Sequence, residues 1–202
     1  MRKLGVWLGL LLPLTGCAQS KEKQAYKLFN DGVAYSLQAM EEQNATKSTE
    51  LEKQAIAKYL QTLQVDSSHL MVRATLGHSY YLLNDFPTAI KWFEASNKVD
   101  TASVASYREL GICRLGTGDI EGGWANLRTA FRLDSVNGPT KLAETKTITA
   151  DDLANLGQQM FSYGEGYAAQ GEPAKARDYQ ETAVNILLVG YSLQSTRKIL
   201  RA

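Results

Sequence analysis

Few residues in this 202-residue chain are of types that could do chemistry. The two histidines, His69 and His78, are nine positions apart, which does not place both imidazoles on one helical face for a metal, and no His-Glu-x-x-His motif is present. The carboxylate pairs Glu41-Glu42 and Asp151-Asp152 fall in predicted turns or first helical turns, where solvation and capping explain them. We therefore predict no catalytic residue, no metal site and no cofactor.

Other catalytic classes find no support in the remaining residues. A two-carboxylate hydrolase needs inward-facing acids in a cleft, and Glu165 alone does not suffice. Cys113 lies in a partly apolar helical segment, which predicts a buried, inert thiol. The chain has 22 basic and 21 acidic residues, so its charge gives no reason to expect a nucleic-acid partner.

The second cysteine, Cys17, closes a distinctive N-terminal segment. Arg2 and Lys3 precede an apolar stretch over residues 4–14, and small residues then lead to the cysteine. These are the parts of a secretory signal, and the stretch is too short for a spanning helix of about 20 residues. The segment Leu14-Thr15-Gly16-Cys17 resembles the lipobox of bacterial lipoproteins. Two other interpretations are an ordinary secretory signal that contains a cysteine and a weak anchor that stays uncut.

The lipobox resemblance implies cleavage before Cys17 and acylation of its sulfur and new amino group. Residues 1–16 would then be a signal peptide and residues 17–24 a lipidated linker. The expected location is the cell envelope of a Gram-negative bacterium, with the lipid as the membrane contact. Ala18 follows the cysteine in place of the aspartate that retains some lipoproteins in the inner membrane, which favours the outer membrane.

The chain also repeats itself with a period of 34 residues. Leu76-Gly77 recurs as Leu110-Gly111, and Asn84-Asp85 recurs as Gly118-Asp119 at the same offset. The second unit has Leu76, Gly77, Tyr80, Ala89, Phe93 and Ser96. This pattern resembles the tetratricopeptide repeat (TPR), a helix-turn-helix unit of 34 residues. In the first unit, the spacing from Gly32 to Ala55 is 23 rather than 12, which indicates an insertion of eleven residues.

The resemblance implies an all-α fold, a right-handed α-solenoid of about four TPR-like helix-turn-helix repeats. The repeat domain is predicted over residues 25–190, with a C-terminal tail or capping helix over residues 191–202. Its units are placed at about 25–69 with the insert, 70–103, 104–137 and 157–190. Between the last two units, Asn137 to Ile148 is expected to form a loop, with Thr149 as the N-cap of the next helix.

The same resemblance implies a peptide-binding groove along the inner helices of the units. The groove is expected to be mostly apolar, with a few polar points, which suits an extended peptide or a partner helix. An alternative is that its aromatic side chains only cover the helices or pack on the chain's own ends. The predicted groove residues are Tyr26, Phe29, Val33, Leu37, His78, Tyr81, Arg108, Ile112, Phe161 and Glu165.

The sequence therefore predicts a membrane-anchored TPR lipoprotein that acts as a non-catalytic scaffold or adaptor. Its partners would be other envelope proteins or peptides. One alternative is a self-associating structural module of an envelope complex, such as those that assemble outer-membrane proteins or pili. This alternative rests on apolar residues of the final repeat helix, including Val184 and Tyr191, that need covering. A periplasmic hydrolase is a third hypothesis without positive support.

Overall fold

The computed structural model describes residues 14–199, with the side chains of residues 20–194. The described residues form eight α-helices and a short 3-10 helix, and no strand occurs among them. The elements are α1 (Leu14–Glu41), α2 (Ala45–Val65), α3 (Val72–Leu82), α4 (Phe86–Asn97), α5 (Val104–Gly116), α6 (Ile120–Asp134), η1 (Ser135–Asn137), α7 (Pro139–Ala169) and α8 (Pro173–Ile199).

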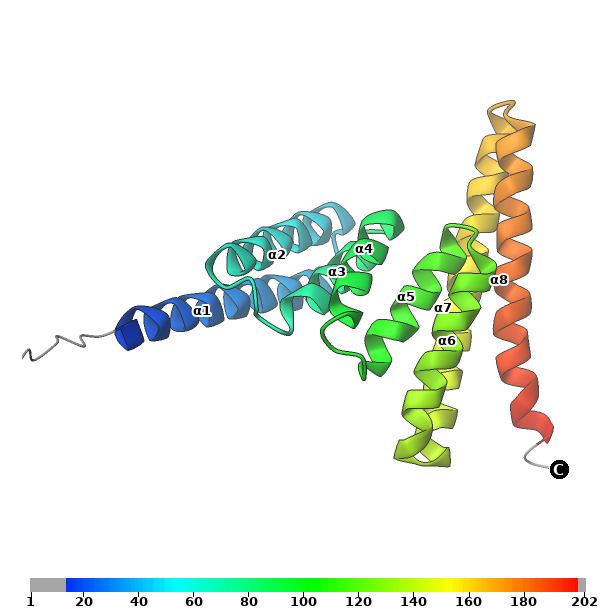
Figure 1. Ribbon diagram of the computed structural model, residues 1–202. Coiled ribbons are helices and arrows are strands. Elements are labelled where there is room, and N and C mark those ends of the chain that lie inside the picture. The colour runs from blue at the N-terminus through cyan, green and yellow to red at the C-terminus, as the bar shows by residue number, and fades with distance from the viewer. Residues whose placement is uncertain (1–13, 200–202) are drawn as a thin grey trace, which may run out of the picture. The chain divides into compact units, whose positions relative to one another are not determined.

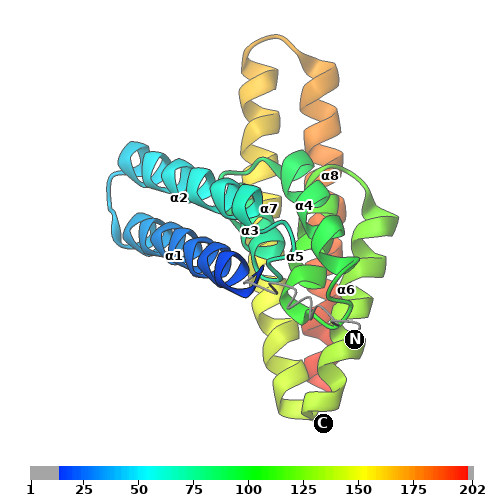
Figure 2. The same ribbon diagram turned by 60° about the vertical axis from the view of Figure 1, so that its left-hand side comes forward.

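Consecutive helices form four helix-turn-helix pairs, which Figure 1 shows along the chain from blue to red. The pair α1–α2 belongs to a first compact unit that ends at His69, and helices α3 to α8 form a second unit that begins at Leu70. Within the second unit, α5 packs against α3 and α4, and both α7 and α8 contact α5 and α6 (Figure 2). The stacked helix pairs of the second unit share one core. The predicted fold class, an all-α TPR-like solenoid, is confirmed.

Glycines bring the two helices of each pair together at equivalent positions. A β-carbon on Gly77 of α3 would lie 2.6 Å from Cδ1 of Phe93 on α4, and one on Gly111 would lie 2.9 Å from Cδ2 of Leu127. Phe93 and Leu127 each follow their glycine by sixteen residues. The 34-residue period of the sequence is therefore a repeated contact between a helix backbone and a large buried side chain.

The first unit makes the same contact across its insertion. A β-carbon on Gly32 would lie 2.5 Å from Cε1 of Tyr59, which is fully buried. The eleven additional residues thus lengthen α1 and α2 around the turn at Gln43–Asn44 and leave their packing in register. The turn is closed by Asn44, whose side chain accepts a hydrogen bond from the Lys47 N–H as the N-cap of α2.

Aspartates and prolines fix where the second helices start. Asp85 caps α4 by accepting a hydrogen bond from the Thr88 N–H, and Asp119 caps α6 by accepting one from the Gly122 N–H. Pro87 lies in the first turn of α4, where its missing N–H has no consequence. The two caps, Asp85 and Asp119, are 34 residues apart, so α4 and α6 start at equivalent positions of the repeat.

Residues 137–148 are not a loop, and Thr149 is not an N-cap. Helix α7 begins at Pro139, directly after Gly138, whose φ of 95° suits glycine. Asp134 at the end of α6 accepts hydrogen bonds from Asn137 Nδ2 at 2.8 Å and from Thr145 Oγ1 at 2.5 Å. These bonds hold the first turns of α7 against α6, so the helical conformation continues through the segment expected to be irregular.

Two other boundaries differ from the prediction. Residues 17–24 are part of α1 rather than a linker, and α8 runs without a break to Ile199 rather than ending before a separate tail helix. The greater part of the predicted signal, residues 1–13, lies outside the described residues. Among the helices that the structure describes, none combines the length and the apolar character needed to span a bilayer.

Helices α7 and α8 form the longest pair of the second unit, joined by a seam of small residues. Ala150, Gly157 and Gly164 of α7 lie opposite Gly190, Ala183 and Ala176 of α8. The core includes α7 residues up to Met160 and α8 residues from Ala183 onward. The end of the hairpin, residues 161–182, contributes only the partly buried Tyr179 to the edge of this core.

Candidate functional site: a cleft between α3 and α7

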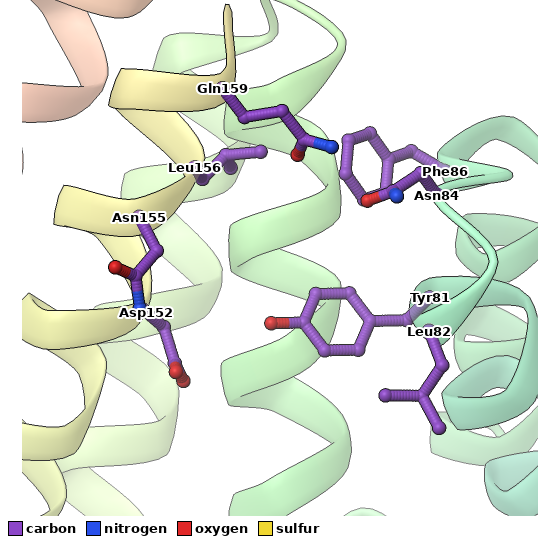
Figure 3. Close-up of a pocket in the computed structure, with 8 residues that line it drawn as sticks. All are labelled: Tyr81, Leu82, Asn84, Phe86, Asp152, Asn155, Leu156 and Gln159. Carbon is purple, nitrogen blue, oxygen red and sulfur yellow. The ribbon is translucent and has the colours of Figure 1, made fainter. Parts of the chain in front are cut away.

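A cleft of about 420 Å³ opens in the second unit between the end of α3, the start of α4 and the middle of α7. Figure 3 shows α7 on one side of the cleft and the α3–α4 turn on the other. The ring of Tyr81 extends from α3 toward α7, and the side chain of Gln159 reaches from α7 toward Phe86 (Figure 3). The cleft is lined by Tyr81, Leu82, Asn84, Phe86, Asp152, Asn155, Leu156 and Gln159.

The end of α5 leaves room for two of these lining residues. A β-carbon on Gly116 would lie 2.8 Å from Cδ2 of Phe86 and 3.5 Å from Cδ2 of Leu156. The rings of Phe86 and Tyr81 have centroids 6.3 Å apart. Phe86 and Leu156 are buried in the core cluster, so the apolar side of the cleft is fixed by packing.

Three carboxamides give the cleft its polar character. Asn84 lies in the α3–α4 turn in the left-handed conformation, with φ of 58°, while Asn155 and Gln159 are one turn apart on α7. Each carboxamide can both donate and accept hydrogen bonds. Gln159 uses its Nε2 to donate to the hydroxyl of Tyr163 at 3.0 Å.

A cluster of charged side chains joins the cleft to the helices behind it. Arg108 of α5 donates from Nη1 to Oδ2 of Asp152, and its Nη2 lies 3.4 Å from Oε1 of Glu109. The other oxygen of Glu109, Oε2, is 2.9 Å from Nδ1 of His78 on α3. One guanidinium is therefore shared by two carboxylates, and helices α3, α5 and α7 are connected through it.

Burial and the charges of this cluster change the pKa of the Tyr81 phenol. Burial raises the pKa of the Tyr81 phenol well above its ordinary value, and the nearby negative charges of Asp152 and Glu109 raise it further. Arg108 acts in the opposite direction without cancelling the effect. The phenol is therefore uncharged at physiological pH and available as a hydrogen-bond donor in the cleft.

The structure brings three of the predicted groove residues together, namely His78, Tyr81 and Arg108. The rings of His78 and Tyr81 have centroids 6.1 Å apart. Tyr81 lines the cleft, and Arg108 reaches it through Asp152. Nothing in the sequence around Arg108 indicates a partner 44 residues away.

Two other groove predictions are wrong because the side chains are in the core. Ile112 is 0% exposed and belongs to the core cluster of the second unit. Phe29 is 7% exposed, with its ring centroid 5.7 Å from that of Tyr59 and 4.9 Å from that of His69. The latter contact also shows that His69 packs on an aromatic ring rather than lying free in a turn.

The remaining predicted residues do not line the cleft. In the first unit, Tyr26 and Leu37 are exposed on α1 at 63% and 55%, and Val33 is half-buried. On α7, Phe161 and Glu165 are exposed. Phe161 follows Gln159 by two residues, about 200° around the helix, so it faces away from the cleft.

Asp152, Asn155 and Gln159 were not predicted as site residues. Asp152 and Asn155 precede the fourth unit, which was predicted over residues 157–190, and Gln159 is not among the groove positions that the resemblance implies. Their spacing of three and four residues, with Leu156 between them, places them on one face of the helix expected after Thr149, and this pattern could have identified them.

Both carboxylates of the charged cluster form ion pairs. Asp152 and Glu109 share Arg108, and Glu109 also pairs with His78. Among the side chains that the structure describes, no group of three or more histidines, cysteines, aspartates or glutamates is arranged to hold a metal ion. The geometry supports binding through shape and hydrogen bonds.

The second unit and its cleft thus define an all-α protein of stacked helix-turn-helix pairs. No protein-family model matches the chain, and no curated protein matches its sequence. A solved structure with similarity is described as the crystal structure of MamA. That structure is 20% identical in sequence, covers 70% of this chain and 92% of its own, and has a TM-score of 0.42.

Proposed function

We propose that this protein is a non-catalytic adaptor that binds an extended segment of a partner protein in the α3–α7 cleft. The observation that carries the proposal is the composition of the cleft, in which the buried side chains of Phe86 and Leu156 lie beside three carboxamides. Its volume of about 420 Å³ lies in the range of sites that bind ligands.

An extended peptide presents both chemistries that this lining would satisfy. Its backbone N–H and C=O groups need hydrogen-bond partners when water is removed, and Asn84, Asn155 and Gln159 can supply them. Its apolar side chains can pack on Phe86 and Leu156, where burial contributes roughly 25 cal/mol per Å².

A panel of displayed peptides can test this function. A library of random linear twelve-residue peptides is selected on the full chain in detergent, and selected peptides are then measured for binding by fluorescence anisotropy. We expect Gln159→Lys to weaken binding at least tenfold. Gln158→Lys is the matched control, because Gln158 is exposed on the same helix outside the cleft. Equal binding to both variants would exclude the cleft as the binding site.

We further propose that the adaptor is held at the cell envelope by lipid on Cys17. The lipobox resemblance of Leu14-Thr15-Gly16-Cys17 supports this proposal. Two or more acyl chains give stable anchoring, which raises the effective concentration of the domain for envelope partners.

The anchor is tested by feeding bacteria that express the full chain an alkyne-labelled palmitate. We expect label on the wild-type chain and on Cys113→Ala, and none on Cys17→Ala. Incorporation into Cys17→Ala would contradict the assignment. Fractionation of the cells then distinguishes the outer membrane, which Ala18 favours, from the inner membrane.

Self-association is a second candidate function, favoured by one feature of α8. Val184, Leu187, Leu188 and Tyr191 are exposed and spaced as a stripe along one side of this helix. If copies associate through this stripe, sedimentation velocity should show a larger species as concentration rises. Val184→Lys should abolish that species, while Val136→Lys, which alters an exposed valine outside α8, should not.

A further inference from the structure

The charged cluster behind the cleft carries one more negative than positive charge when His78 is neutral. Arg108 supplies one positive charge, while Asp152 and Glu109 each supply a negative one. Arg108 and Glu109 are mostly buried, and Asp152 is the member that lines the cleft. The excess charge is therefore presented to the cleft through Asp152.

One oxygen of Asp152 remains available to an occupant. Oδ2 accepts the hydrogen bond from Arg108, whereas Oδ1 accepts none from the side chains that the structure describes. The other lining residues are neutral, so no positive charge of the lining competes for Asp152. Burial raises the pKa of the Tyr81 phenol, and the charges of Asp152 and Glu109 raise it further, so this neighbour of Asp152 stays uncharged.

We propose that the cleft selects peptides that place a lysine or arginine side chain against Oδ1 of Asp152. This inference rests on the proposed function and specifies the chemistry of the partner. The apolar stem of a long basic side chain can lie along Tyr81 while its charged end reaches the carboxylate. A peptide with an acidic residue at that place would be repelled by the same excess charge.

His78 makes the selection depend on pH. A protonated His78 beside Glu109 would bring the cluster to neutrality and remove the excess negative charge. The ion pairs that connect this cluster join His78 of α3, Arg108 and Glu109 of α5, and Asp152 of α7. Binding of a basic peptide should weaken as the pH falls from 8 to 5, while a neutral analogue should be less affected.

The test uses the displayed twelve-residue library on the full chain, followed by synthesis of the selected peptides with amidated C-termini and acetylated N-termini. We expect enrichment of lysine or arginine at one position, and a loss of affinity of at least tenfold when that residue is replaced by glutamine. Asp152→Asn should cause a similar loss, whereas Asp151→Asn, on an exposed neighbour, should not. Circular dichroism establishes that each variant is folded.

A second variant keeps the test decisive if Asp152→Asn does not fold. Gln159→Glu adds a negative charge to the cleft and should strengthen binding of the basic peptide several-fold, and Gln158→Glu is its control. If peptides bind in the cleft without basic enrichment and Gln159→Glu weakens them or has no effect, this inference is overturned and the proposed function stands. If no selected peptide distinguishes Gln159→Lys from Gln158→Lys, both are overturned.

Discussion

Gly111 and Gly123 face each other where α5 and α6 cross. A β-carbon on either residue would lie 2.9 Å from the carbonyl oxygen of the other. The contact leaves no room for a side chain on either helix, because each glycine is opposed by a backbone carbonyl oxygen and by a buried leucine, Leu127 or Leu115. In the α5–α6 pair, this contact corresponds to the seam of small residues that joins α7 and α8.

Replacement of Gly111 by alanine should therefore destabilise the fold. We expect Gly111→Ala to lower the free energy of unfolding by about 1–3 kcal/mol, the usual range for overpacking a core. Gly166→Ala is the matched control, because a β-carbon there meets nothing within 4 Å inside α7. The control should gain about 0.5–1 kcal/mol from the higher helix propensity of alanine. Urea unfolding curves measure both, and a neutral Gly111→Ala would refute the packing argument.

Asp134 should make stability depend on pH. Hydrogen bonds from Thr145 and then Asn137 lower the pKa of its carboxyl. A lowered folded-state pKa gives stability that is present above the unfolded value of about 3.9 and is lost as pH falls through the folded value. Asp134→Asn should thus lose stability at pH 7, and the difference from wild type should shrink below about pH 4. Unfolding in urea at both pH values measures this, and a constant difference would contradict it.

Cys113 should be unreactive in the folded protein. Its side chain is fully buried, and burial raises the pKa of the thiol well above its ordinary value, so little thiolate exists near neutral pH. In a Cys17→Ser background, we expect iodoacetamide to modify Cys113 only as fast as the chain unfolds. Mass spectrometry follows the modification, and addition of urea should accelerate it. Rapid modification without denaturant would show that the thiol is accessible.

The end of the α7–α8 hairpin should open more readily than its base. Residues 161–182 contribute only Tyr179 to the edge of the core cluster, and Tyr179 stacks on Tyr167 with ring centroids 5.2 Å apart. We expect amide hydrogens there to exchange faster than those of residues 150–160. Tyr179→Ala should accelerate exchange at the end of the hairpin alone. Equal protection along both helices would contradict this division.

The sequence predicted the central repeats well because their determinants are local. Gly77 and Gly111 mark close helix contacts, and Asp85 and Asp119 mark helix starts, so the 34-residue spacing carries most of the information. Residues 138–148 were misassigned because Gly138-Pro139 is typical of a loop. The bond from Thr145 to Asp134 that favours the helix joins residues eleven positions apart and leaves no pattern in the sequence.

The candidate site was predicted only in part, for a related reason. Tyr81 and Arg108 follow from the repeat, whereas Asp152 lies outside the predicted units and is placed by an ion pair across 44 residues. Ile112 was misplaced because an apolar side chain on an inner helix can face either the cleft or the core. Its burial is decided by packing within the second unit, which the period alone does not specify.

A photo-reactive amino acid placed at position 159 or at position 158 of the full chain in living bacteria tests binding in the cleft most directly. These adjacent positions share a helix, and only the first lies in the cleft. We expect discrete cross-linked products from position 159, none from position 158, and loss of the products when Asp152→Asn is added. Products of the same size and yield from both positions would contradict binding in the cleft.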